Sequence, residues 1–207
     1  MSKAYDLKQK SNFSTTASNF KTEPESETSN SADSVIQSAV DIQIEKLEGR
    51  QRRVFAKIQI PYPLEQVWQV LTDYETFAEF MPNLTQSRRL DHPTGGVRIE
   101  QVRTKKFMGK NISACSVFDI EEKFPHSIHY QLIEGDMKAF SGCWRLEPWS
   151  LSESKAGIAL TYDFFVVPKR IFPMALVEHI LSHDIPANML VIRQRVEDLF
   201  GQNLSRF

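Results

Sequence analysis

The sequence predicts an α+β fold, a curved antiparallel sheet wrapped around a long C-terminal helix, with two short helices after the first strands. Three observations carry this prediction. Two amphipathic helical segments fit between Pro61 and Pro82, a run of alternating strands follows them, and a proline-interrupted helix closes the chain between Pro173 and Phe200. Helices and strands that are segregated along the chain favour an α+β arrangement. A sheet around one helix leaves a space between them, and the contents of that space decide the function.

The length of 207 residues suits one domain plus a tail. Residues 1–34 are assigned to the tail, because Ser, Thr and Asn occupy fifteen of those 34 positions without any apolar periodicity. Such a segment cannot bury enough apolar surface to offset its chain entropy, so it is predicted to be disordered. Residues 35–207 are predicted to form the single folded domain.

Composition excludes several functional classes. A net charge of −1 provides no field that would favour nucleic acid as a partner. No apolar run approaches the ~20 residues that a membrane-spanning helix needs, and no secretory signal or transit peptide is recognisable. Cys115 and Cys143 fall in predicted strands and fit neither a disulfide framework nor a metal pair. We expect a soluble cytoplasmic protein in which both cysteines are reduced and buried in the core.

The first elements are two strands and two helices. Apolar residues alternate with polar ones over 40–44 and again over 54–60, which predicts a hairpin, or one long strand with a bend at Glu48-Gly49. Pro63 suits the first position of a helix. Helical spacing then gives an apolar stripe, in which Trp68 is expected to anchor the core; its members are Leu64, Val67, Trp68 and Leu71. Asp73 is expected to cap a second short helix that ends at Pro82.

Six further strands follow in sequence, separated by short turns, which predicts antiparallel pairing. Their approximate ranges are 84–90, 97–107, 111–121, 128–132, 140–146 and 158–166. The closing helix is expected to break at Asp184-Ile185-Pro186, where Asp184 can cap a fresh start. Beyond it, a stripe that must lie on the sheet consists of Ile185, Met189, Ile192, Val196 and Leu199.

Three segments of the sequence resemble a known superfamily. IPYPLEQVWQVLTDYETFAEFMPNL from Ile60 to Leu84 is similar to its opening segment, FSGCWRLEPW from Phe140 to Trp149 to a later strand, and TYDFFVVPKRIFP from Thr161 to Pro173 to the last strand and its turn into the closing helix. This is the StAR-related lipid-transfer-like superfamily with the helix-grip fold. Within it, the sequence most resembles the polyketide cyclase/dehydrase and coenzyme Q-binding protein branch.

The resemblance implies a ligand in an internal cavity. Members of the superfamily bind sterols, phospholipids, quinones, polyketides or plant hormones, and only some of them catalyse a reaction. We therefore expect non-catalytic binding and carriage of a hydrophobic small molecule, a lipid or a prenylated quinone. The alternative is a polyketide cyclase/aromatase-type enzyme that acts in the same cavity. A protein-interaction module that uses the tail is a third hypothesis.

The inward faces of the strands supply the expected ligand site. Strand alternation places an aromatic set on the side that faces the closing helix, with two phenol hydroxyls that can donate to a quinone carbonyl. The ligand-binding candidates are Phe118, Tyr130, Phe140, Trp144, Leu160, Tyr162 and Phe164. The same pattern is also compatible with side chains that fill a solid core.

Two turns are candidates for the cavity mouth. Lys105, Lys106 and Lys110 bracket Phe107-Met108, and Lys169-Arg170 precede a second apolar group that includes Phe172 and Met174. Basic residues beside exposed apolar ones can dock on anionic headgroups, so peripheral membrane contact is a further expectation. The alternative is that these are solvated charges on ordinary turns.

No catalytic, metal or cofactor constellation is recognised. His179 and His183 share a helix face but lack a third ligand nearby in sequence, so a surface pair is expected. Strand parity places Asp119 and Asp163 away from the cavity, and it places Glu134 at its rim or inside. Arg145 and Glu147 also lie on the outer face, as a cross-strand pair.

Overall fold

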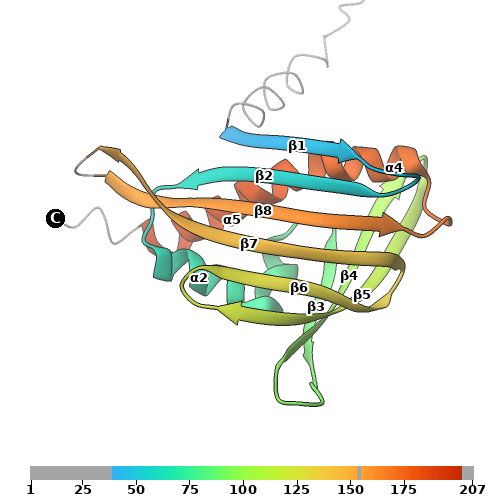
Figure 1. Ribbon diagram of the computed structural model, residues 1–207, viewed down its shortest axis with the longest axis horizontal. Helices are drawn as coiled ribbons and strands as arrows, with labels where there is room; N and C mark the ends of the chain where they lie inside the picture. Colours follow the sequence, from blue (N-terminus) through green and yellow to red (C-terminus); the bar gives the residue numbers. More distant parts are fainter. Residues whose placement is uncertain (1–38, 153–154, 202–207) are drawn as a thin grey trace, which may run out of the picture.

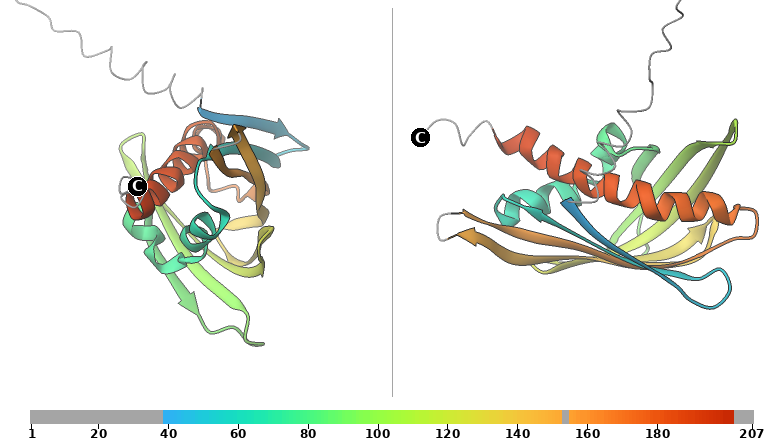
Figure 2. Two further views of the ribbon diagram at one scale, coloured as in Figure 1. Left: turned by 90° about the vertical axis from the view of Figure 1, so that its left-hand side faces the viewer. Right: turned by 90° about the horizontal axis from the view of Figure 1, so that it is seen from above.

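The computed structural model describes residues 39–152 and 155–201, so the expected tail over 1–34 lies outside the described residues. The predicted α+β architecture is confirmed: one eight-stranded sheet in the order β1-β2-β8-β7-β6-β5-β4-β3 curves around a long C-terminal helix (Figures 1 and 2). Every neighbouring pair is antiparallel. The strands are β1 (Val40–Lys46), β2 (Arg52–Ile60), β3 (Leu84–Leu90), β4 (Val97–Phe107), β5 (Lys110–Lys123), β6 (Ser127–Gly135), β7 (Met137–Ser152) and β8 (Lys155–Pro168).

The first two strands form the hairpin that their alternation predicts, rather than one bent strand. Ile42 lies opposite Ala56 in that hairpin, and Ile58 lies opposite Leu160 on the other side of β2. The inward positions of β2 are almost fully buried, as alternation requires. Strand β2 therefore joins the N-terminal edge of the sheet to its C-terminal strand, β8.

Three short helical segments follow β2: α2 (Leu64–Thr72), the 3₁₀ turn η1 (Tyr74–Thr76) and α3 (Phe77–Phe80). Pro63 precedes the first helical residue, so it lies one position earlier than predicted, and Asp73 makes no side-chain cap. Trp68 is half-buried and packs its ring edge against Phe124, which is 59% exposed. Trp68 therefore packs against the core from its edge, whereas Val67 and Leu71 are fully buried in it.

The closing helix is continuous, which corrects the expected break. It consists of α4 (Met174–His179), the π-helical turn η2 (Ile180–Asp184) and α5 (Ile185–Phe200). Asp184 has helical backbone angles and caps nothing with its side chain. The wider π turn accommodates Pro186, whose ring would clash with an ordinary preceding turn. Leu199 is 46% exposed, so the predicted stripe on the sheet ends at Val196.

Two arginines fasten the closing helix to the first hairpin. Arg52, which is buried on β2, donates from Nε and Nη2 to one carboxylate oxygen of Glu178 on α4, at 2.9 and 2.6 Å. Arg50 donates to the carbonyls of Lys169 and Phe172 in the turn between β8 and α4. These contacts fix where the helix leaves the sheet. None of the described helices is long and apolar enough to span a bilayer.

Candidate functional site

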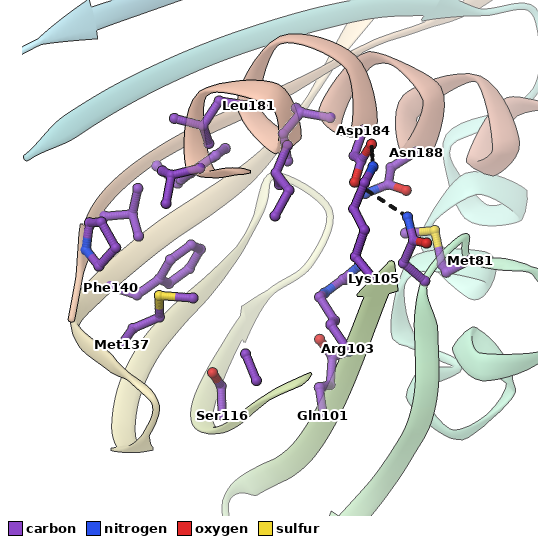
Figure 3. Close-up of a pocket in the computed structure, with 18 of the residues that line it drawn as sticks. Met81, Gln101, Arg103, Lys105, Ser116, Met137, Phe140, Leu181, Asp184 and Asn188 are labelled. Carbon is purple, nitrogen blue, oxygen red and sulfur yellow. Dashed lines mark hydrogen bonds and ion pairs between the residues drawn. The ribbon is translucent and has the colours of Figure 1, made fainter. Parts of the chain in front are cut away.

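A cavity of about 220 Å³ lies between the closing helix and the inner face of the sheet. It is several times larger than the ~30 Å³ that one water molecule occupies in the liquid. Its walls come from α3, from β4 through β8 and from the helical segments α4, η2 and α5 (Figure 3). The protein interior is therefore hollow where the sheet curves away from the helix.

Six of the seven aromatic and aliphatic candidates lie in the wall of this cavity: Phe118, Tyr130, Phe140, Trp144, Tyr162 and Phe164. The seventh, Leu160, is fully buried in the main core together with Ile58 and Met189, and it does not line the cavity. Strand parity correctly places Leu160 inward. Its position along β8, beneath the packed part of α5, removes it from the hollow.

The aromatic side chains form a connected layer on the sheet. Trp144 and Tyr162 stack with ring centroids 3.9 Å apart and an interplanar angle of 7°. Phe164 continues the layer toward Phe140, with centroids 5.4 Å apart. Gly142 lies beside them, and a Cβ there would approach the Phe164 Cβ to 3.0 Å and the Phe140 ring to 3.2 Å. The absence of a side chain at position 142 lets this layer lie flat on the sheet.

The four predicted mouth residues have different surroundings. Phe172 is buried and lines the cavity, whereas Met174 is half-buried against the cluster of apolar side chains beneath α4. Phe107, the last residue of β4, and Met108, in the turn that follows, do not line it, and Met108 is 87% exposed. Only Phe172 therefore borders the space itself.

The polar end of the cavity was missed by the sequence analysis. Gln101, Arg103 and Lys105 project into it from β4, and Asp184 and Asn188 approach from the helix (Figure 3). A signal for the β4 residues was present, because they share strand parity with the fully buried Ile99. Asp184 and Asn188 likewise recur at helical spacing with Leu181 and Ile185.

Lys105 and Asp184 close part of the cavity wall with an ion pair. The Lys105 Nζ lies 2.5 Å from a carboxylate oxygen of Asp184, and the two side chains are 19% and 16% exposed. The amide of Asn83 donates to the other oxygen of Asp184 at 3.3 Å. These bonds connect β4 and the segment before β3 to the π turn of the closing helix. Lys105 and Asp184 are 79 residues apart in the sequence.

The side chain of Arg103, which is half-buried in the cavity wall, has no hydrogen bond or ion pair with any described residue. Burial lowers the pKa of Arg103 below its usual value, against the opposing effects of the nearby Tyr162, Asp184 and Tyr130. Burial likewise raises the pKa values of Tyr130 and Tyr162. The two phenols are therefore neutral near pH 7, and the guanidinium is the charge that remains uncompensated.

The outer face of the sheet holds the other charged candidates. Asp119 accepts two hydrogen bonds from Arg98, and Asp163 binds Arg53 and Arg145. The expected pairing of Arg145 with Glu147 is therefore corrected, since Arg145 reaches diagonally across to Asp163 on β8, which lies opposite Cys143 in the register. These arginines hold the pKa values of both aspartates below their usual range.

Three further candidates are exposed. Glu134 on β6 does not line the cavity. His179 and His183 stack with ring centroids 4.5 Å apart on the outer side of the helix. Within residues 39–152 and 155–201, no group of three His, Cys, Asp or Glu side chains is arranged to hold a metal ion. The groups available for chemistry in the cavity are therefore a guanidinium, two neutral phenols, an ion pair and a few amides and hydroxyls.

Comparison with known proteins supports the resemblance. The model of the family described as "Polyketide cyclase / dehydrase and lipid transport" matches residues 60–190. The ribosome association toxin RatA of Escherichia coli is 25% identical over 105 residues, which cover 51% of this chain and 64% of that protein. The match thus spans less than two thirds of the length of this curated relative.

Two solved structures share the fold. A STAR-related lipid transfer protein from Xanthomonas axonopodis superposes with a TM-score of 0.56 at 16% identity, covering 77% of this chain and 94% of that one. The Zhui aromatase/cyclase from a Streptomyces species gives a TM-score of 0.53 at 19% identity, covering 71% of this chain and 94% of that one. Fold and family together support the binding of a hydrophobic ligand.

Proposed function

Because this chain belongs to the polyketide cyclase/dehydrase and lipid transport family, we propose that it binds and carries a hydrophobic small molecule, a lipid or a prenylated quinone, without altering it. The observation that carries this proposal is the cavity of about 220 Å³ with its aromatic and aliphatic wall. Protein interiors are normally packed to the density of organic crystals, so a hollow of this size is stabilised when a ligand fills it.

The physical basis of binding is the removal of apolar surface from water. Each Å² of apolar area that the ligand and the wall bury together contributes about 25 cal/mol. A ring can lie against the layer formed by Phe140 and Phe164, and the Tyr162 hydroxyl can donate to a carbonyl oxygen of that ring. A cavity of about 220 Å³ favours a single ring system or a single chain over a two-chain phospholipid held entirely inside.

Native mass spectrometry tests this function on the full chain purified without detergent. We expect a co-purified small molecule, or uptake of added ubiquinone analogues and single-chain lipids, accompanied by a higher melting temperature. A released ligand of unchanged mass is the expected result for a carrier. A protein that stays empty and whose melting temperature does not respond to any of these compounds would contradict the proposal.

The second candidate function is a polyketide cyclase or aromatase. Its specific support is the convergence of Arg103, Tyr130 and Tyr162 in the cavity, where they could polarise and protonate a carbonyl-rich substrate. A carrier is favoured because cyclisation also needs a general base. The phenols are protonated near pH 7, and Asp184, the cavity's acidic group among the described residues, is already bound to Lys105. A polyketide recovered lighter by one water after incubation with the protein would identify the enzyme instead.

Peripheral membrane contact is part of the same proposal. The turn between β4 and β5 and the turn between β8 and α4 lie at the same end of the molecule (Figures 1 and 2). Met108 is 87% exposed and Ile171 is 73% exposed at these two tips. The exposed cations beside them are Lys106, Lys110 and Arg170. Lys105 is excluded from this group because it is paired with Asp184, and Lys169 donates to the carbonyl of Gly135.

We expect the double substitution Met108→Ser and Ile171→Ser to reduce binding to vesicles of phosphatidylcholine and phosphatidylglycerol several-fold, because both apolar tips would no longer insert. Co-sedimentation with the vesicles measures this effect. Phe124→Ser is the matched control, since Phe124 is 59% exposed beside α2, at the opposite end of the sheet. Equal loss in both variants, or no binding by the unmodified protein, would exclude docking by these turns.

A further inference from the structure

The cavity has an unbalanced charge. Two basic residues, Arg103 and Lys105, and one acidic residue, Asp184, contribute to its wall. Lys105 and Asp184 neutralise each other through their ion pair. The charge that remains is that of Arg103, which has no hydrogen-bond or ion-pair partner among residues 39–152 and 155–201. A charge in the protein interior is costly unless it is paired, and the half-buried guanidinium of Arg103 is left unsatisfied by the described residues.

A second polar group in the same wall is unsatisfied. Asn188 on α5 is 8% exposed, and its side-chain oxygen is buried without a hydrogen-bond partner. Rotation of the amide exchanges this oxygen and the NH₂ group, so Asn188 can present either an acceptor or a donor to a ligand. Arg103 from the sheet and Asn188 from the helix thus offer two unpaired groups to the space between them (Figure 3).

The other end of the cavity is apolar. Met137 and Phe140 lie across the space from Arg103, Lys105 and Asp184 (Figure 3), and Leu181 lies toward the same apolar end. Val166, Phe172 and Val177 extend the apolar wall. The cavity is therefore polarised, with one unpaired cation at one end and a purely hydrophobic lining at the other.

We propose that the cavity selects a hydrophobic carboxylate, a ligand with one negative charge whose head is bound by Arg103 and Asn188 and whose apolar part lies against Phe140 and Met137. This inference rests on the proposed function and specifies its ligand class. A carboxylate matches the planar fork of a guanidinium with two parallel hydrogen bonds, and its single charge balances the single unpaired cation. A phosphate monoester would bring about two negative charges, and a neutral quinone would leave the guanidinium uncompensated.

Calorimetric titration of the full chain with decanoate and with 1-decanol tests the head-group preference directly. The two probes have the same chain length and differ in the charged group. We expect decanoate to bind at least about tenfold more tightly than decanol, because hydrogen bonds to charged groups are the strong ones in a low-dielectric site. High salt should preserve this preference, since buried pairs are screened much less than surface pairs.

Substitutions assign the preference to Arg103. Arg103→Met keeps the length of the side chain and should reduce decanoate affinity about tenfold while leaving decanol affinity unchanged or higher. Arg103→Lys should retain part of the preference. Lys138→Met, at an exposed position of β7 outside the cavity wall, is the control and should bind both probes like the unmodified protein. Because Arg103→Met removes an unpaired, half-buried charge, we also expect it to raise the melting temperature of the ligand-free protein.

The outcomes separate this inference from the proposed function. Equal affinity of the unmodified protein for decanoate and decanol would overturn the carboxylate preference while the carrier function stands. A decanoate preference that persists in Arg103→Met, or that disappears in high salt or in Lys138→Met, would overturn the assignment to the cavity cation. Failure of both probes to bind the unmodified protein would contradict the inference and count against the carrier function itself.

Discussion

Replacement of Ala114 by Phe should abolish ligand binding while leaving the protein folded. Ala114 lines the cavity from β5, directly across from Arg103 in the β4–β5 register. A benzyl group at this position would occupy much of a cavity of about 220 Å³ next to its polar end. We expect affinity for hydrophobic probes to fall by at least about tenfold, which corresponds to 1.4 kcal/mol.

Stability should change in the opposite direction. Filling a cavity with a side chain commonly stabilises a protein by ~0.5–2 kcal/mol, so the ligand-free variant should unfold at higher denaturant concentration. Ser113→Phe is the matched control, since the exposed Ser113 lies on the outer face of the same strand. Retained binding in Ala114→Phe would show that ligands bind elsewhere. Loss of both binding and stability would show overpacking, which would mean that the hollow cannot accept even one ring.

The fold was predictable because its signals are local. Period-two alternation identifies each strand, and helical spacing after Pro63 identifies α2. The break in the closing helix was predicted wrongly because the contact that decides it is not local. Asp184 looks like a local cap next to Pro186, but Lys105 reaches it from 79 residues away and holds it in a continuous helix. A tertiary ion pair of this kind leaves no mark in the sequence around Asp184.

The candidate site was predictable in its aromatic part and not in its charges. Parity places Phe118, Tyr130 and Trp144 inward, and the structure places all three in the cavity wall. Arg103 and Lys105 share the parity of Ile99, yet charged residues are so rarely buried that they are normally assigned to solvent. Parity identifies the inner face, whereas the curvature of the sheet decides which inner residues border a hollow. Leu160 illustrates the difference, because it faces inward beneath the packed part of α5.

Replacement of Trp144 by Ala should cause a large loss of stability. Trp144 is 7% exposed and stacks on Tyr162, and it lies opposite Ile128 on β6. Truncation of a buried aromatic side chain to Ala costs about 3–5 kcal/mol. We expect a value near the lower end of this range, about 3 kcal/mol, because one side of the indole already borders the cavity and makes no protein contacts there. Urea unfolding measures the loss.

Trp149→Ala provides the control for this prediction, because Trp149 is half-buried on the same strand and lies outside the cavity wall. Removal of the Trp149 indole should lower the free energy of unfolding clearly less, by about 1 kcal/mol, because this side chain is partly exposed. Trp144→Ala should also enlarge the hollow, so the folded fraction should accept a bulkier ring than the unmodified protein does. If the two substitutions lower the free energy of unfolding equally, and Trp144→Ala does not change the size of ligand that binds, Trp144 would be an ordinary core residue. The aromatic layer would then have no part in setting the dimensions of the cavity.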